Sequence, residues 1–378
     1  MKALLIGVGA AGNKSVLTVV KEQKAKLEDV ILINSTSKDI PKDYKGKKII
    51  LSPNDSGCGK ERSLSKDYTF TAINSGKLNL EKEVQQYDIV VIVTSLEGGT
   101  GSGAAPVIAK YCNEMLAKNT HLIGFTGFEE DVRGLQNTIE FFQEIDSEIV
   151  VQTIQNKLFL KAAGNNKFKA ELLANQELAK RIEIINGSLL KDSEQNIDDT
   201  DIYKVINTKG YMTAEIIEIR ESLMDTSDFD KLCKKMIYDS KSLKSNDAGQ
   251  IRMGVIMNLS PASEDAIDSM YTVLKEAYGD PFECFTHKQF DKTLPEFVSF
   301  ISSGMKLPID EVEAVYKRYK EESAKVNKSA DDFFTKIGGL KGNSEDSRFN
   351  MGRPSSSQKP KSKEEFMSQF QTKPSKKG

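Results

Sequence analysis

The sequence predicts an α/β fold in which helices cover both faces of a parallel sheet. Short, nearly continuous apolar runs alternate with helical patterns through the first half of the chain, which is typical of buried parallel strands. Several of these runs end in glycine-rich turns that open a helix, as in open α/β domains that bind phosphate. With 378 residues, 38% of them hydrophobic and 29% charged, the chain is long enough for two globular units.

The elements of the first half follow from the period of the apolar residues. We expect strands over residues 2–6, 30–33, 48–51, 89–94 and 121–126. We expect helices that end near residue 23 and near residue 116, and one over residues 131–145.

Aliphatic residues recur at helical spacing over residues 168–190, which predicts a long central helix. Strands near 214–219, 252–259 and 296–302, with a helix over 262–277, form a second α/β unit. A highly charged helix follows Pro308, and the remaining stretch is too rich in Ser, Pro, Lys and Gly to order itself. The predicted boundaries are 1–167, 168–190, 191–305, 306–326 and 327–378.

Composition argues against several classes of protein. The four cysteines are scattered without paired spacing, which disfavours a disulfide scaffold or a zinc site and indicates a reducing compartment. The apolar run at the amino terminus is broken by glycine after four residues, unlike a signal peptide. No run approaches the roughly 20 apolar residues that span a bilayer, so we expect a cytoplasmic protein without membrane contact.

The most informative segment is Gly98-Gly-Thr-Gly-Ser-Gly103, which is separated by three residues from the apolar run of residues 88–94. Glycines let consecutive backbone N–H groups approach an anion, and the amino terminus of a following helix attracts negative charge. We expect that helix from Ala104, with Pro106 in its first turn. The segment therefore predicts a loop that binds phosphate.

Two other glycine-rich turns bear on the ligand. Gly7-Val-Gly-Ala-Ala-Gly12 matches the dinucleotide fingerprint and favours an NAD-dependent oxidoreductase, but Asn34 stands where that reaction class needs a carboxylate for the ribose. Gly57-Cys-Gly59-Lys60 is similar to the end of a P-loop, but Glu61 replaces the Ser or Thr that binds magnesium. A third interpretation joins all three turns into one phosphate site, because each follows a strand of the same sheet.

The segment 98–103 resembles the signature of the tubulin/FtsZ superfamily of GTPases, in the tubulin spelling with Ser102. The likeness includes residues 7–13 and 97–109 and continues to about Gly304. Glu97 departs from it, because family members usually carry another glycine there. The resemblance implies a tubulin/FtsZ-like fold, with a Rossmann-like GTPase domain, a long central helix, a second α/β domain and a disordered tail. It also implies binding of GTP or GDP with Mg²⁺.

The resemblance also assigns binding residues. Glu129 is placed on the ribose hydroxyls and Arg133 near the α-phosphate, chemistry that suits a carboxylate and a guanidinium. Asn156 and Asn175 are placed along the guanine edge, where an amide can donate and accept. The remaining nucleotide contacts are Gly7, Gly9, Ala10, Ala11, Gly12, Asn13, Asn34, Gly57, Gly59, Gly98, Gly99, Thr100, Gly101, Ser102 and Gly103.

The aromatic residue that stacks on the base in FtsZ corresponds to Glu171, so Phe168 or Leu172 is the candidate substitute.

Asn196, Asp198 and Asp201 match the Asn-x-Asp-x-x-Asp spacing of the family's synergy loop. In the family this loop enters the nucleotide site of the neighbouring subunit, where its carboxylates can orient an attacking water. The resemblance thus implies hydrolysis of GTP to GDP and phosphate on polymerisation, in a head-to-tail contact that does not close. Taken alone, the acidic residues fit an N-cap cluster equally well. We assign no side chain as a metal ligand.

The carboxyl-terminal part decides the branch of the superfamily. The charged helix that directly follows the last strand resembles plasmid and phage tubulins of the TubZ and PhuZ type. From Lys341 onward, nine Lys or Arg face four Asp or Glu, and such a basic tail suits a DNA-bound adaptor protein. We therefore expect a filament that positions or segregates plasmid or phage DNA. On composition alone the tail fits a solubilising segment equally well. The alternative functions are an FtsZ-type division GTPase and the oxidoreductase.

Overall fold

A ten-stranded sheet runs through the chain in the order β3-β2-β1-β4-β5-β6-β7-β10-β8-β9. The computed structural model describes residues 1–337 except 23, 130, 146–147, 191–198, 220–230, 233, 238, 246–250, 260–275, 277–280 and 282, and only the backbone of Asp199 and of residues 324–337. The strands are β1 (Ala3–Val8), β2 (Val30–Asn34), β3 (Lys47–Ile50), β4 (Ile89–Ser95), β5 (Asn119–Thr126), β6 (Val150–Gln155), β7 (Gly210–Glu218), β8 (Arg252–Asn258), β9 (Glu283–Gln289) and β10 (Phe297–Met305).

The pairing of the strands divides the sheet into two parts. β1 to β6 are all parallel to their neighbours, as predicted. β10 pairs antiparallel with β7 and β8, and β9 pairs parallel with β8. The predictions omitted β6, whose apolar run is broken by Gln152 and Thr153, and β9, whose residues are mainly polar.

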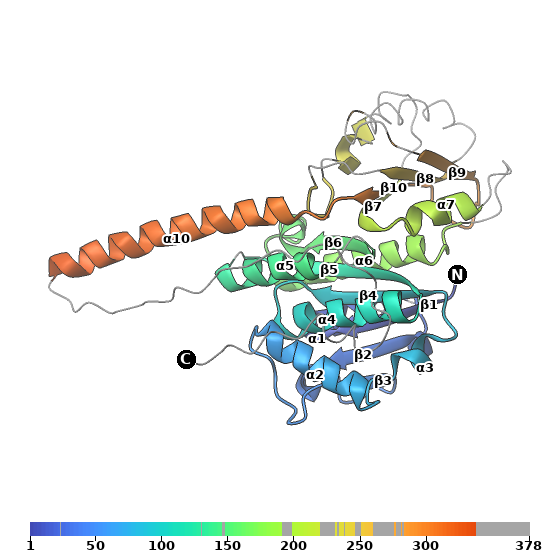
Figure 1. Ribbon diagram of the computed structural model, residues 1–378. Coiled ribbons are helices and arrows are strands. Elements are labelled where there is room, and N and C mark those ends of the chain that lie inside the picture. The colour runs from blue at the N-terminus through green and yellow to red at the C-terminus, as the bar shows by residue number, and fades with distance from the viewer. Residues whose placement is uncertain are drawn as a thin grey trace.

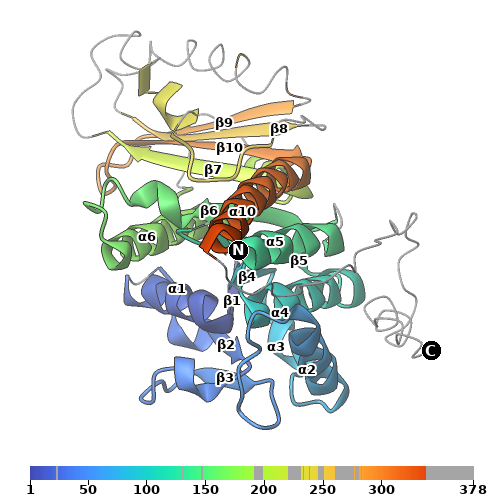
Figure 2. The ribbon, with the colours of Figure 1, turned by 90° about the vertical axis from the view of Figure 1, so that its left-hand side faces the viewer.

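Helices cover both faces of the sheet, as predicted (Figures 1 and 2). One face carries α2 (Arg62–Asn74), α3 (Leu80–Val84), α4 (Gly99–Lys110), α5 (Val132–Glu144) and α10 (Ile309–Ile337). The other face carries α1 (Gly9–Lys21), α6 (Lys167–Ile185) and α7 (Asp199–Ile206). Short helical turns lie at η1 (Leu27–Asp29), η2 (Ser37–Asp39), η3 (Tyr111–Met115) and η4 (Asn156–Phe159).

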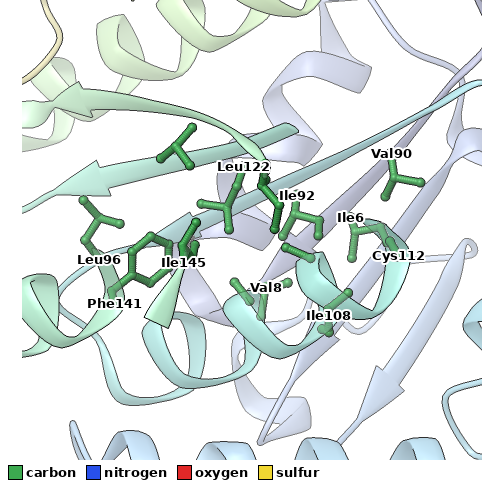
Figure 3. Close-up of a cluster of buried hydrophobic side chains, with 14 of the residues drawn as sticks. Ile6, Val8, Val90, Ile92, Leu96, Ile108, Cys112, Leu122, Phe141 and Ile145 are labelled. Carbon is green, nitrogen blue, oxygen red and sulfur yellow. The ribbon is translucent and has the colours of Figure 1, made fainter. Parts of the chain in front are cut away.

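The core on the first face joins the sheet to α4 and α5. Ile6, Val8 and Ile92 of the strands pack with Ile108 of α4 and Phe141 of α5 (Figure 3). All five side chains are fully buried. Because this core lies directly behind the glycine-rich turns, it holds the strand ends from which those turns leave the sheet.

Two predicted helix boundaries were wrong. The central helix α6 ends at Ile185 rather than residue 190, because Gly187 takes a positive φ of 73°, a common way to end a helix. The helix after Pro308 continues to Ile337, eleven residues into the predicted flexible tail. It has no Gly or Pro before Gly338 and is rich in good helix formers. The predicted helix over 262–277 falls almost wholly on residues outside the described part, and so does the tail from residue 338.

The start of α4 also differs from the prediction. The helix begins at Gly99 rather than Ala104, so the glycine segment itself forms its first turn and Pro106 lies inside the helix. Pro106 has no N–H to donate to the carbonyl of Ser102, four residues earlier. Arg62 of α2 donates to that carbonyl instead, from Nη2 at 2.9 Å and from Nε at 3.3 Å.

Candidate nucleotide site

The three glycine-rich turns of the first half meet at one edge of the sheet. A Cβ atom added to Gly9, in the turn after β1, would lie 3.0 Å from the backbone nitrogen of Gly101. A Cβ at Gly99 would lie 2.8 Å from the backbone of Lys60 and Glu61, which precede α2. A Cβ at Gly12 would lie 2.1 Å from the carbonyl oxygen of Val93 in β4. These turns therefore approach so closely that side chains would collide.

Three helices begin at this meeting point without a capping side chain. Neither α1, α2 nor α4 has a side-chain hydrogen bond at its N-cap or an acidic residue in its first turn. By contrast, Asp131 caps α5 and Asn166 caps α6. The unpaired N–H groups and the helix dipoles of α1, α2 and α4 thus favour an anion at the same place.

Gly57 and Gly59 contribute differently from the other glycines. Both are exposed, and a Cβ added to either would meet nothing within 4 Å. Gly59 has a positive φ of 53°. The backbone conformation of the turn, and not close packing, therefore favours glycine there. The loop reaches the glycine segment through the backbone of Lys60 and Glu61.

The asparagines of the first two turns have separate surroundings. Asn13 is buried and donates to the carbonyl of Ile33 at 3.3 Å, while its Oδ1 has no hydrogen-bond partner within the described residues. Asn34 uses both ends of its amide, donating to Asp39 at 3.0 Å and accepting from the N–H of Ser35. The hydroxyls of Ser35 and Thr100 lie 2.7 Å apart. Asn34 therefore shapes the turn, and Ser35 contacts the glycine segment.

Glu129 and Arg133 have different partners. The exposed Glu129 carboxylate pairs with the ammonium of Lys167 at the start of α6, and this contact lowers the pKa of Glu129. Arg133 is exposed and its Nε donates to the carbonyl of Lys60 at 3.4 Å. Each residue therefore borders a different segment of the proposed site.

The proposed base-contacting residues border α6. Asn175 is buried and its Oδ1 accepts from the hydroxyl of Ser15 in α1 at 2.6 Å. Asn156 is half-buried in η4, which packs against α6. Phe168 and Leu172 present apolar surface on α6, with 71% and 46% of their areas exposed.

Lys14 of α1 lies beside this apolar surface, with its Nζ 5.4 Å from the centre of the Phe168 ring, and pairs with Glu171. An exposed aromatic ring thus stands one turn from Glu171, the position that the resemblance assigns to the stacking residue.

Two buried polar side chains that were not predicted from the sequence connect the loops by hydrogen bonds. The Nδ2 of Asn137 in α5 donates to the carbonyl of Lys60 at 3.1 Å and to that of Glu97 at 3.0 Å. Arg62, only 3% exposed, bonds Ser102 and pairs with Glu140 and Glu144 of α5. Both side chains contact elements other than their own, so no short sequence motif predicts these contacts. The one hint in the sequence was Pro106, which leaves the carbonyl of Ser102 in need of a donor from outside the helix.

Glu97 lies at the start of the glycine segment and reaches towards β5. Its Oε1 accepts from the N–H of Gly127 at 2.6 Å, and burial raises the pKa of its carboxyl. The side chain borders a cavity of about 120 Å³ between α5 and α10. The lining includes Thr126, Gln155, Lys157, Leu135, Leu243, Val312 and Val315.

Asp201 lies at the opposite end of the sheet from the glycine segment. The helix α6 begins beside Glu129, and the residue after it, Asn186, accepts from the amino group of Met1 at 3.2 Å. The 19 residues of α6 span about 28 Å. α7 lies at this distal end (Figure 1), where Tyr203 closely contacts Gly187. Asn196 and Asp198 lie outside the described residues.

No helix among the described residues is long and apolar enough to cross a membrane.

Comparison with known proteins agrees with this geometry. Residues 2–163 match the model of the tubulin/FtsZ family GTPase domain. The cell division protein FtsZ of Buchnera aphidicola is 26% identical over 279 residues, which cover 71% of this chain and 69% of that protein. The tubulin-like protein TubZ of Clostridium botulinum C phage is 27% identical over 186 residues, 48% of this chain and 50% of TubZ.

Solved structures share the fold of most of the chain. The GTPγS-bound protofilament of CetZ2 from Haloferax volcanii superposes with a TM-score of 0.69 and 17% identity, over 86% of this chain and all of that one. Residues 2–163 thus form a tubulin/FtsZ family GTPase domain, and the chain has a tubulin/FtsZ-like fold.

Proposed function

We propose that this protein binds GTP at the meeting point of the three glycine-rich turns, assembles head to tail, and hydrolyses GTP at each subunit interface. The observation that carries the proposal is the separation of the glycine turns from Asp201 by the length of α6. A carboxylate at one end of a subunit can reach a triphosphate at the other end only in the next subunit. Such a contact repeats without closing and gives a filament.

The phosphates would lie on the converging amino termini of α1, α2 and α4. The crowding at Gly9, Gly12 and Gly99 supports this assignment, because it lets the backbone N–H groups approach an anion. Among the described residues no group of three or more His, Cys, Asp or Glu is placed to hold a metal ion. We therefore propose that Mg²⁺ is carried mainly by the phosphate oxygens, where it would neutralise charge that develops during hydrolysis.

The nucleoside would lie between α1 and α6. The orphaned Oδ1 of Asn13 and the exposed ring of Phe168 support a polar base with an aromatic face. Asn156 and Asn175 would read the guanine edge, with Asn175 exchanging its bond to Ser15 for one to the base. Glu129 would bind the ribose hydroxyls, and Arg133 the α-phosphate.

At the interface, Asp201 of one subunit, with Asn196 and Asp198, would orient the attacking water on its neighbour's γ-phosphate. In the free subunit Asp201 pairs with Lys204 at 2.6 Å. The carboxylate lies near the surface, where 28% of the side chain is exposed. An accessible carboxylate suits this task.

We further propose that the filament positions or segregates plasmid or phage DNA in the cytoplasm, through a DNA-bound adaptor that binds the tail. The long helix α10, which starts four residues after β10, and the basic composition of residues 341–378 support this role over division. The similarity to FtsZ keeps an FtsZ-type division GTPase as the alternative.

The test is light scattering of the purified chain with GTP, GDP or ATP, combined with measurement of nucleotide binding and phosphate release. We expect GTP alone to give assembly, with phosphate release that rises steeply above a critical protein concentration. Tight binding of NAD without binding of GTP would refute the proposal, and so would phosphate release that is strictly proportional to protein concentration.

A further inference from the structure

We infer that Glu97 is a positioning residue of the nucleotide site, whose carboxylate holds the glycine segment 98–103 against the turn after β5. The inference rests on the proposed function, because the segment that it would position is the proposed phosphate loop. Glu97 immediately precedes Gly98, the N-cap of α4. Any movement of Glu97 is therefore transmitted directly to the first turn of that helix.

The residue is held at both its side chain and its backbone. The Oε1 atom accepts from the N–H of Gly127 at 2.6 Å, which ties the end of β4 to the end of β5. The carbonyl of Glu97 accepts from Asn137 at 3.0 Å, and the same Asn137 amide group donates to Lys60 at 3.1 Å. Through these bonds Glu97 connects the glycine segment to both neighbouring loops.

Two glycines provide the space that the Glu97 side chain occupies. A Cβ added to Gly127 would lie 2.4 Å from Glu97 Oε2, and one added to Gly134 would lie 3.2 Å from Glu97 Cβ. Neither glycine has a positive φ, so the backbone conformation does not require glycine at either position. Room for Glu97 accounts for Gly127, and room for Glu97 together with Asp131, whose Oδ2 would lie 3.1 Å from an added Cβ, accounts for Gly134.

Holding a charged carboxylate at this buried position costs free energy. This cost argues that Glu97 is not an incidental surface side chain. Burial raises the pKa of Glu97 and Asp131 adds to this, while the hydrogen bond from Gly127 and the charges of Lys60 and Lys157 oppose it. Glu129 and Glu311 line the same cavity and increase the negative charge around it. A glycine at position 97 would avoid this cost and would also lose the bond to Gly127.

The test compares Glu97→Gln and Glu97→Ala with Asp88→Ala. Asp88 is a matched control, because its carboxylate accepts from the N–H of Lys2 at 2.8 Å at the opposite edge of the same sheet. Two quantities are measured: hydrogen exchange of the peptide spanning residues 96–110 in nucleotide-free protein, and affinity for a fluorescent GTP analogue. The thermal midpoint of each variant shows that it is folded.

We expect Glu97→Ala to speed exchange of that peptide and to weaken analogue binding about tenfold, the effect of one lost hydrogen bond. Glu97→Gln should stay within about twofold of the parent, because its amide oxygen can still accept from Gly127. Asp88→Ala should leave both quantities at the parent values even where it lowers the thermal midpoint.

Parent-like exchange and affinity in Glu97→Ala would overturn the inference, and so would a defect in Glu97→Gln as large as that in Glu97→Ala. Failure of the parent chain to bind the analogue would instead refute the proposed function. In that case the exchange measurement still decides whether Glu97 holds the segment.

Discussion

Asp201 lies in the first turn of α7, about 28 Å along α6 from the turns that would hold the nucleotide of its own subunit. Its proposed role is to orient water on the nucleotide of a neighbouring subunit. The role depends on charge rather than on shape, because an amide of the same size cannot accept a proton from the water.

We predict that Asp201→Asn lowers GTP turnover at least about 100-fold, the usual effect of losing such a group. GTP binding and filament assembly should remain near the parent level, because Asp201 is remote from the glycine turns of its own subunit. Phosphate release and light scattering on the same samples check this. Asp67→Asn, an exposed change on α2, serves as the control, and full turnover in Asp201→Asn would contradict the catalytic assignment.

His121 makes stability depend on pH. It is completely buried in β5, with its Nε2 3.3 Å from Oδ1 of Asn207, and burial lowers its pKa to about 4 from an ordinary 6.5. The neutral imidazole therefore stabilises the fold fully above pH 6.5. As the pH falls from 6.5 towards 4, the unfolded chain binds a proton that the folded chain excludes, and this stability is lost.

We predict that the parent chain loses about 2 kcal/mol more stability between pH 7.5 and pH 5 than the variant His121→Gln. Urea unfolding of both proteins at the two pH values measures the difference, since other titrating groups contribute equally to both. An equal pH dependence in the two proteins would show that His121 is accessible to protons in the folded state.

At the scale of elements, the glycine segment is held by a contact between α2, α4 and α5. Pro106 leaves the carbonyl of Ser102 without its helical partner, and Arg62 supplies two donors to it. Arg62 also pairs with Glu140 and Glu144, at 3.0 and 2.6 Å. One buried guanidinium thus satisfies a carbonyl and two carboxylates at the base of the proposed phosphate loop.

We predict that Arg62→Met lowers the free energy of unfolding by about 3 kcal/mol, because it leaves the Ser102 carbonyl without its donor and removes the guanidinium from the two carboxylates. Among the described residues, the carboxylate of Glu144 then keeps only Lys66 and that of Glu140 only Gln136. Arg62→Lys should cost less, since it keeps the charge and loses only the fork of donors. Urea unfolding measures both variants. A loss in Arg62→Met of less than about 1 kcal/mol would mean that water or Lys66 replaces the guanidinium.

At the scale of the whole molecule, the chain has an end that would hold the nucleotide, an end that would complete a neighbour's site, and a long helix that extends beyond the sheet. α10 packs against α5 near its start and projects away from the rest of the molecule (Figure 1). The basic residues from Lys341 onward follow this helix in the sequence, so they lie outside the elements that build the GTPase domain.

We predict that truncation after Gly342 leaves GTP turnover and filament assembly unchanged and abolishes recruitment of the adaptor–DNA complex. Co-sedimentation of filaments with labelled DNA and adaptor measures the recruitment, and light scattering confirms that filaments form. Unchanged recruitment by the truncated filaments would remove the main support for DNA segregation and favour the division alternative.

The sequence alone determined the parallel α/β half, the glycine turns and the family, because each depends on local periodicity or on a short contiguous motif. The start of α4 at Gly99, the strands β6 and β9, and the roles of Arg62 and Asn137 depended on contacts between distant segments. Glu97 shows the difference most clearly. In the sequence it is a departure from a glycine motif, and only the fold places Gly127 and Gly134 around it, because the ends of neighbouring strands meet in space.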